Sequence, residues 1–146
     1  MAAVPLVYYL VAIFSAVRFF RAERARRLPE FAPPVSLLKP VHGVDFASRT
    51  NFESFCRQGY PEYEILFCVN DMEDPAVPLL RQAIKDFPRC SIRILSGAPK
   101  LGSNQKVNNL VRLAREAKHE IIVQSDGDVR VSPDYLKNVV AEFAAK

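Results

Sequence analysis

Four short apolar stretches alternate with four helical patterns along residues 35–146, and this alternation constrains the fold more than any other feature. The apolar stretches are residues 35–38, 63–69, 91–95 and 120–124. Capping residues and apolar spacing predict helices over residues 45–58, 74–87 and 106–117, and from residue 132 onward. Strands that alternate with helices predict the α/β class, with a mostly parallel sheet covered by helices.

The helix signals are specific residues. Asp45 is predicted to cap the first helix, which Gly59 ends, and Asp74 followed by Pro75 opens the second. The predicted buried face of the second helix consists of Val77, Leu80, Ile84 and Phe87. That of the third consists of Val107, Leu110, Val111 and Ala114.

The first 20 residues predict a transmembrane helix. No charged residue occurs from Ala2 to Val17, and the apolar run continues to Phe20 with Arg18 as its one interruption. Five arginines follow or end the run: Arg18, Arg21, Arg24, Arg26 and Arg27. This charge order favours an uncleaved anchor over a cleaved signal peptide, and it places the following residues in the cytoplasm. A helix buried in a partner subunit is the alternative.

Residues 21–34 form a basic and proline-rich segment, which predicts a linker before a domain over residues 35–146. The net charge of the chain is +4, and much of the positive charge lies in the arginine cluster. Such a cluster is typical of a membrane-flanking segment, so we expect no nucleic-acid partner. The three cysteines have no metal-binding or disulfide spacing, which fits a reducing compartment.

Polar residues follow several predicted strands, at the edge where parallel sheets bind ligands. Asp126 and Asp128 follow the fourth strand, with Gly127 between them. Two carboxylates at this spacing suit Mg²⁺ or Mn²⁺, which keeps positions open for phosphate oxygens. The same residue types are common in turns, so a simple turn is the alternative.

Two further residues are candidates for binding a nucleotide. Asp71 follows the second strand and can accept hydrogen bonds from a nucleobase or a ribose; no local capping role is evident for it, whereas Asp74 is explained as a cap. Lys106 follows the glycine-containing loop before the third helix, where backbone N–H groups and an ammonium suit an anion. A solvated lysine in an exposed loop is the alternative.

Four segments together carry a resemblance to a known family: VSLLKPVHGVD (35–45), NFESFCRQGYPEYEILFCVNDMEDPA (51–76), LGSNQKVNNL (101–110) and SDGDVRVSPDYL (125–136). They resemble family 2-type glycosyltransferases with a GT-A fold, and more closely the ceramide glucosyltransferase family and its bacterial, hopanoid-associated relatives. The resemblance implies a Rossmann-like GT-A sheet preceded by one transmembrane helix. It also implies inverting transfer of a sugar from a UDP-sugar to a lipid hydroxyl at a membrane.

The resemblance also assigns roles to residues. Asp71 and Asp126 match the first two of the family's three functional acids, Asp128 matches the second acid of a full DxD, and Lys106 matches a basic position near the nucleotide or diphosphate. The expected donor-binding residues are therefore Asp71, Lys106 and Asp126, and the expected ligands of Mg²⁺ or Mn²⁺ are Asp126 and Asp128.

One departure from the family pattern concerns the end of the chain. The family continues with a third aspartate, expected to be the catalytic base, then a Q/R-x-x-R-W motif and further membrane segments. This chain ends at Lys146 and contains no tryptophan. The resemblance therefore implies a truncated, donor-binding half without the catalytic base.

Several alternatives stay open at this point. The donor sugar is glucose or N-acetylglucosamine, and the acceptor is ceramide, a hopanoid or another lipid. A non-catalytic, membrane-tethered nucleotide-binding fragment is the main rival function. A haloacid-dehalogenase-type phosphatase is disfavoured because its DxD usually ends the first strand, and because Arg130 stands where Thr or Val is usual.

Overall fold

The computed structural model describes residues 3–25, 30–97 and 99–144. The chain divides into two units, Met1–Glu30 and Phe31–Lys146. Residues 26–29, which include Arg26, Arg27 and part of the predicted linker, lie outside the described residues, as does Ala98 in the predicted loop 96–105.

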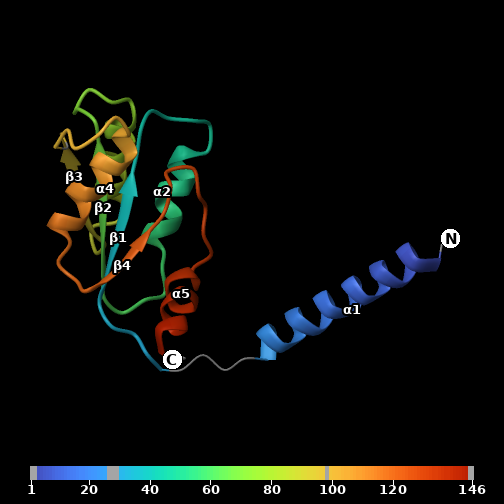
Figure 1. Cartoon of the computed structure of the whole chain (residues 1–146). Coiled ribbons are helices and arrows are strands. Elements are labelled where there is room, and N and C mark those ends of the chain that lie inside the picture. Colours follow the sequence, from blue (N-terminus) through green and yellow to red (C-terminus); the bar gives the residue numbers. More distant parts are fainter. Residues whose placement is uncertain (1–2, 26–29, 98, 145–146) are drawn as a thin grey trace. The chain divides into compact units, whose positions relative to one another are not determined.

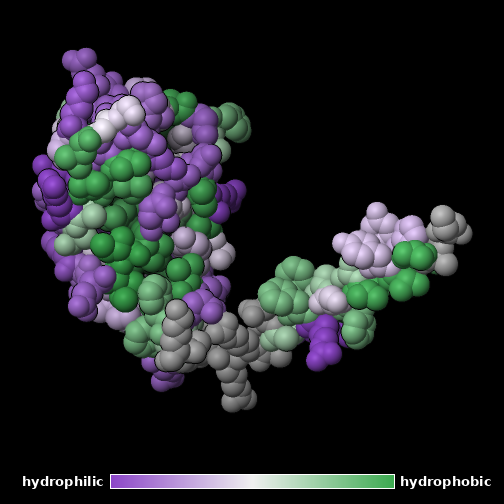
Figure 2. Space-filling view, viewed as in Figure 1, coloured by the Kyte–Doolittle hydropathy of each residue, from purple (hydrophilic) through white to green (hydrophobic). Residues whose placement is uncertain are grey.

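The first unit contains one helix, α1, which spans Ala3–Ala25. Its segment Val4–Ala22 has a mean hydropathy of 1.5 and is long and apolar enough to cross a membrane, although a signal sequence would pass the same test. No part of that segment is buried within the protein. Figure 2 shows that hydrophobic residues cover most of the viewed side of α1. Length and composition thus agree with the predicted anchor.

The second unit is built on a sheet of four parallel strands, which confirms the predicted fold class. The strands are β1 (Val35–Pro40), β2 (Tyr63–Val69), β3 (Ser91–Ser96) and β4 (Ile121–Gln124). Their order is β3-β2-β1-β4, with every neighbouring pair parallel (Figure 1). Each crossover between parallel strands passes through a helix, so the carboxyl ends of all four strands lie at one edge.

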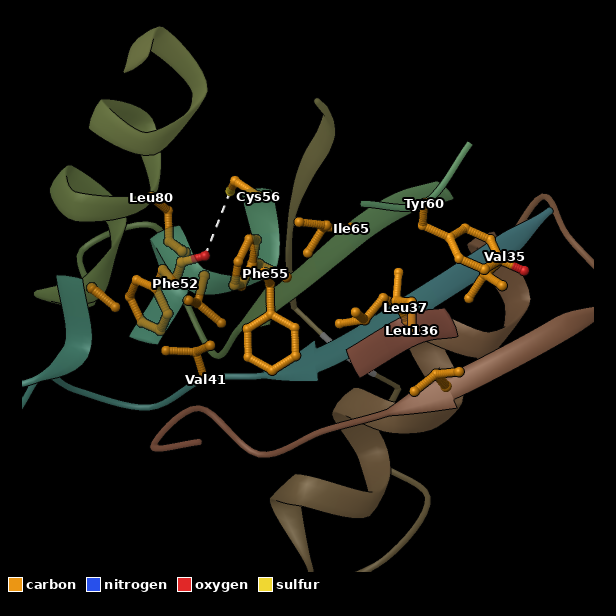
Figure 3. Close-up of a cluster of buried hydrophobic side chains, with 14 of the residues drawn as sticks. Val35, Leu37, Val41, Phe52, Phe55, Cys56, Tyr60, Ile65, Leu80 and Leu136 are labelled. Carbon is orange, nitrogen blue, oxygen red and sulfur yellow. Dashed lines mark hydrogen bonds between the residues drawn. The ribbon is translucent and has the colours of Figure 1, made fainter. Parts of the chain in front are cut away.

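Helices cover both faces of the sheet. The helices α2 (Ser48–Cys56), α3 (Ala76–Asp86) and α5 (Tyr135–Ala144) pack on one face, and α4 (Gln105–Glu116) packs on the other. Each face carries its own hydrophobic core: a larger core under α2, α3 and α5, and a smaller core under α4. Leu37 belongs to the larger core and Leu38 to the smaller one, because successive side chains of a strand point to opposite faces. In Figure 3, Phe52 and Phe55 of α2 pack with Leu37 and Val41 in the larger core.

The helices differ from the prediction at their ends. Asp45 accepts hydrogen bonds from Ala47 N and Ser48 Oγ, so it closes a turn ahead of α2 instead of capping the helix, and α2 ends at Cys56, before Gly59. The sequence predicts that Asp74 is the residue that caps the second helix, but Pro75 takes that position and α3 begins at Ala76. The Asp74 carboxylate still accepts a 2.8 Å hydrogen bond from Ala76 N. Side chains that bond the chain before the first helical turn displace the helix start.

The buried faces of two helices also differ from the prediction. Ile84 of α3 is exposed, and Ala83 is buried in its place. In α4, Val107 is exposed, whereas Asn108, Asn109 and Leu113 are buried. The face of α4 is thus rotated toward two asparagines, because the loop before it folds back: Asn108 Oδ1 accepts hydrogen bonds from Leu101 N and Gly102 N.

Candidate functional site

A cavity of about 540 Å³ lies at the carboxyl ends of β1, β2 and β4. The end of β1, Asn70 after β2, the first residues of α4 with the loop before it, and Asp126 with Gly127 after β4 line this cavity. The loop that follows β1 leaves the sheet at the top of Figure 1. The cavity therefore occupies the edge at which open α/β sheets bind ligands.

Lys106 and Asp126 meet in this cavity. Lys106 Nζ lies 2.8 Å from Asp126 Oδ1, and Gln124 Nε2 donates a hydrogen bond of 2.8 Å to the same oxygen. The hydrogen bond from Lys106 is the main cause that lowers the pKa of Asp126 below its usual range. Both side chains are about half exposed, so water and salt screen the pair. Two residues 20 positions apart in the sequence thus share one ionised, accessible site.

Asp128 lies at the border of a second, smaller cavity. This cavity has a volume of about 310 Å³ and is lined by the β1–α2 loop, Phe52, Gly127 and Asp128. Gly127 borders both cavities. Asp126 therefore lines the 540 Å³ cavity and Asp128 the 310 Å³ cavity, with a single glycine between them.

The acids of this loop fit one class of metal ion. Among the described residues, no group of three or more His, Cys, Asp or Glu side chains could hold a metal. Asp126 and Asp128 offer hard oxygen donors, which suit Mg²⁺ or Mn²⁺ when phosphate oxygens and water complete the coordination. The donor chemistry thus fits a cation that binds together with a diphosphate. Because the two carboxylates line different cavities, they would have to turn toward one point to share that cation.

Asp71 is placed differently from the other predicted residues. Its side chain is exposed and is not among the residues that line the 540 Å³ cavity. Its Oδ1 accepts a 2.9 Å hydrogen bond from Glu73 N, so the expectation that Asp71 has no local role is wrong. An aspartate side chain readily accepts a hydrogen bond from the backbone N–H two residues later, which closes a short turn.

Asn70 and Asn109 line the cavity, and sequence reasoning missed both. Asn109 Nδ2 donates to Asn70 Oδ1 at 3.0 Å, and Gln105 Nε2 donates to Asn109 Oδ1 at 3.2 Å. The available signal was positional: Asn70 is the first residue after β2, and Asn109 follows Gln105 by one helical turn. This amide chain links the end of β2 to α4.

Lys39 is the other residue that sequence reasoning missed. Its side chain is fully buried near the end of β1, with its Nζ 3.6 Å from the centre of the Phe55 ring and 2.6 Å from the Asp126 carbonyl oxygen. Burial lowers the pKa of Lys39 to about 7, and the carboxylates of Asp126 and Asp128 oppose that shift. The signal was a lysine directly after the predicted strand 35–38. The strand extends through Lys39 to Pro40, and a buried lysine is rare without a specific partner.

A larger cavity, of about 600 Å³, lies at the other end of the sheet. The start of β2, the residues around the start of β3, and Cys56 and Cys90 line it. None of Asp71, Lys106, Asp126 and Asp128 borders it. Size alone therefore does not identify the site, and the cavity that collects the polar strand ends is the candidate.

Comparison with curated proteins relates the chain to lipid glycosyltransferases. It is 31% identical over 132 residues to ceramide glucosyltransferase 1 of Caenorhabditis elegans, an alignment that covers 90% of this chain and 28% of that protein. It is 28% identical over 151 residues to ceramide glucosyltransferase of Komagataella phaffii, covering 96% of this chain and 30% of the relative. The chain thus spans less than a third of the length of these relatives.

Solved structures share the fold. The mannosyltransferase PcManGT from Pyrobaculum calidifontis, in complex with GDP-Man and Mn²⁺, superposes with a TM-score of 0.65 at 20% identity, over 94% of this chain and 43% of that one. Residues 1–349 of TarS from S. aureus in complex with UDP-GlcNAc give a TM-score of 0.59 at 14% identity, over 77% and 31%. These neighbours confirm the GT-A-type fold.

The model of the family described as "Glycosyl transferase family 21" matches residues 1–146, the whole of the chain. The parallel sheet and the ceramide glucosyltransferase relatives agree with that match. The chain therefore belongs to glycosyl transferase family 21.

Proposed function

We propose that this chain is the donor-binding part of a membrane-anchored hexosyltransferase, which transfers a sugar from a UDP-sugar to a lipid hydroxyl such as that of ceramide or a hopanoid. The observation that carries the proposal is the contact between Lys106 and Asp126 in the cavity at the strand ends. It joins a cationic group to a carboxylate at the place where a nucleotide diphosphate would need both. The ceramide glucosyltransferase relatives support the lipid acceptor.

The chain's own residues would divide the work of holding the donor. Asp126 and Asp128 would be the protein ligands of Mg²⁺ or Mn²⁺, which would neutralise charge on the diphosphate leaving group. Lys106 would exchange Asp126 for a phosphate oxygen, since both are anionic partners for its ammonium. The neighbour that binds GDP-Man and Mn²⁺ supports a divalent cation here.

Asp71 remains a proposed ligand of the nucleoside. It lies one residue beyond Asn70, which borders the cavity. To reach a bound base or ribose, its carboxylate would have to release Glu73 N. Donor binding would thus reorganise the β2–α3 turn.

We also propose an arrangement along the membrane. Residues 1–20 would be the anchor, residues 21–34 the basic linker at the cytoplasmic surface, and residues 35–146 the donor-binding half of the domain. The catalytic base and the acceptor contacts would lie in a longer protein, in keeping with the share of the relatives' length that this chain spans.

Calorimetric titration of the detergent-solubilised chain with UDP, with and without Mn²⁺, tests the proposal. We expect Mn²⁺-dependent binding that Asp126→Ala abolishes. Asp134→Ala is the matched control, because Asp134 is an exposed aspartate at the start of α5 and lines neither of the two cavities at the strand ends. A folded wild-type chain that binds no UDP would refute the donor-site assignment.

A further inference from the structure

Two buried polar side chains hold the backbone of the loop that carries Asp126 and Asp128. Lys39 Nζ donates to the Asp126 carbonyl oxygen at 2.6 Å, and Asn51 Nδ2 donates to the Asp128 carbonyl oxygen at 3.1 Å. We propose that Lys39 and Asn51 are positioning residues that preset both aspartates of this loop for a divalent cation, an inference that rests on the proposed donor site.

Lys39 is an unusual group to bury for structure alone. It lies in β1, on the same side of the strand as Val35 and Leu37, so its side chain enters the larger apolar core beside Phe55. Within the described part of the chain, no carboxylate oxygen lies within 4.0 Å of its ammonium. Its polar partners are the Asp126 carbonyl and, at 3.4 Å, Ser125 Oγ. A buried ammonium is expensive without an ion-pair partner, and an apolar side chain of similar length would fill the space at lower free energy.

Asn51 holds the other end of the loop from a different element. It lies in α2, is 3% exposed, and reaches across 77 residues of sequence to the Asp128 carbonyl. The two donors thus bind the carbonyl groups of the residues before and after Gly127, one from the sheet and one from a helix. Glycine has the widest backbone freedom of any residue, so a loop centred on it gains the most from being held.

The hydrogen bonds from Lys39 and Asn51 hold the backbone of the loop and leave the carboxylates of Asp126 and Asp128 for other partners. Both donors bind carbonyl oxygens, whereas the Asp126 carboxylate meets Lys106 and Gln124 and Asp128 borders the smaller cavity. A metal site gains affinity when outer groups orient its ligands before the ion arrives, and removal of such groups typically lowers metal affinity 10–100-fold. Lys39 and Asn51 are placed to orient the ligands in this way.

The test compares Lys39→Met and Asn51→Leu with the wild-type chain in detergent. Both changes keep a similar shape. Asn51→Leu removes the whole amide, and Lys39→Met removes a cation close to Asp126 and Asp128 together with the donor. Loss of that cation alone would favour Mn²⁺, so a fall of affinity in Lys39→Met reports the lost position of the loop. We expect about a tenfold or larger loss of Mn²⁺ affinity in each variant, measured by water-proton relaxation with Mn²⁺ alone. We expect the thermal midpoint of Lys39→Met to stay equal or rise, because a buried charge is replaced by an apolar group. A merely structural lysine would lower the midpoint and leave the Mn²⁺ affinity unchanged.

A second measurement judges the proposal without any ligand. Hydrogen–deuterium exchange should accelerate over residues 125–129 in both variants and remain at the wild-type rate in the strands. The matched controls are Lys137→Met and Asn138→Leu, which change exposed residues of the same types on α5. Should exchange over residues 125–129 be unchanged in both variants, the positioning role is wrong, even if the wild-type chain binds Mn²⁺ and UDP. If exchange accelerates in the variants but the wild-type chain binds no Mn²⁺, Lys39 and Asn51 do position the loop, and the assignment of Asp126 and Asp128 as metal ligands is wrong.

Discussion

The partner of Lys106 in the structure differs from the one that the sequence suggests. In the sequence it is a basic residue at a helix start, suited to an anion. In the structure its partner is Asp126, whose pKa it lowers. An ion pair this exposed adds little stability, because solvent screens it. The role that we propose for it is therefore ligand binding, because the ammonium lies 2.8 Å from Asp126, the candidate metal ligand.

Removal of this ammonium should separate two kinds of binding. In Lys106→Met we expect UDP affinity in the presence of Mn²⁺ to fall roughly tenfold, the value of one charge-assisted hydrogen bond. Affinity for Mn²⁺ alone should stay equal or rise, because a cation no longer competes for Asp126. Calorimetric titrations with each ligand measure both, and Lys85→Met, an exposed lysine of α3, is the control. A parallel fall in both affinities would contradict this assignment.

At the scale of elements, a buried carboxylate ties three strands together. Glu64 of β2 accepts hydrogen bonds from Ser36 Oγ of β1 at 2.7 Å and from Lys118 N before β4 at 2.8 Å, and it pairs with Arg93 of β3 at 3.1 Å. Burial alone would raise the pKa of Glu64, but the hydrogen bonds from Lys118 N, Ser36 and Arg93 outweigh it and lower that pKa. The network fixes the α4 side of the sheet.

The lowered pKa predicts how stability depends on pH. A carboxylate whose pKa is lower in the folded state stabilises the fold above its unfolded pKa of about 4.3, and this contribution is lost as pH falls through the folded pKa. Glu64→Gln should therefore lower the free energy of unfolding near neutral pH by about 2 kcal/mol and flatten its acid dependence. Urea unfolding across acidic pH measures both. The exposed Glu120→Gln should behave as wild type, and an unchanged acid limb in Glu64→Gln would exclude this role.

At the scale of the whole molecule, the sheet has an open side at β4. Among the described residues, β4 pairs with β1 alone, and its Ile122 is 43% exposed. Figure 2 shows hydrophobic residues gathered on the viewed face of this unit, where Figure 1 places β1 and β4. An apolar, unpaired strand edge favours association between chains.

Neighbouring residues of β4 should respond to charge in opposite ways. Ile122→Lys should reduce light scattering on heating without lowering the thermal midpoint, because this side chain faces outward. Ile121→Lys should lower the midpoint sharply, because Ile121 packs against the larger core. Unchanged light scattering in Ile122→Lys would show that this strand is not the cause of association.

The sequence by itself determined the strands to within two residues, because short apolar runs are bounded by turn residues: β2 spans the predicted residues 63–69, whereas β1 extends beyond the predicted 35–38 to Pro40. The polar strand ends fall at one edge. Helix ends and buried helix faces could not be predicted, since local hydrogen bonds between side chains and nearby backbone displaced the start of α2 and turned Asn108 of α4 inward. The pairing of Lys106 with Asp126, the local role of Asp71 and the burial of Lys39 were likewise decided by tertiary structure. Each depends on a partner that is distant in the chain or on a local backbone geometry, and residue spacing does not encode which side chains a folded sheet brings within hydrogen-bonding distance.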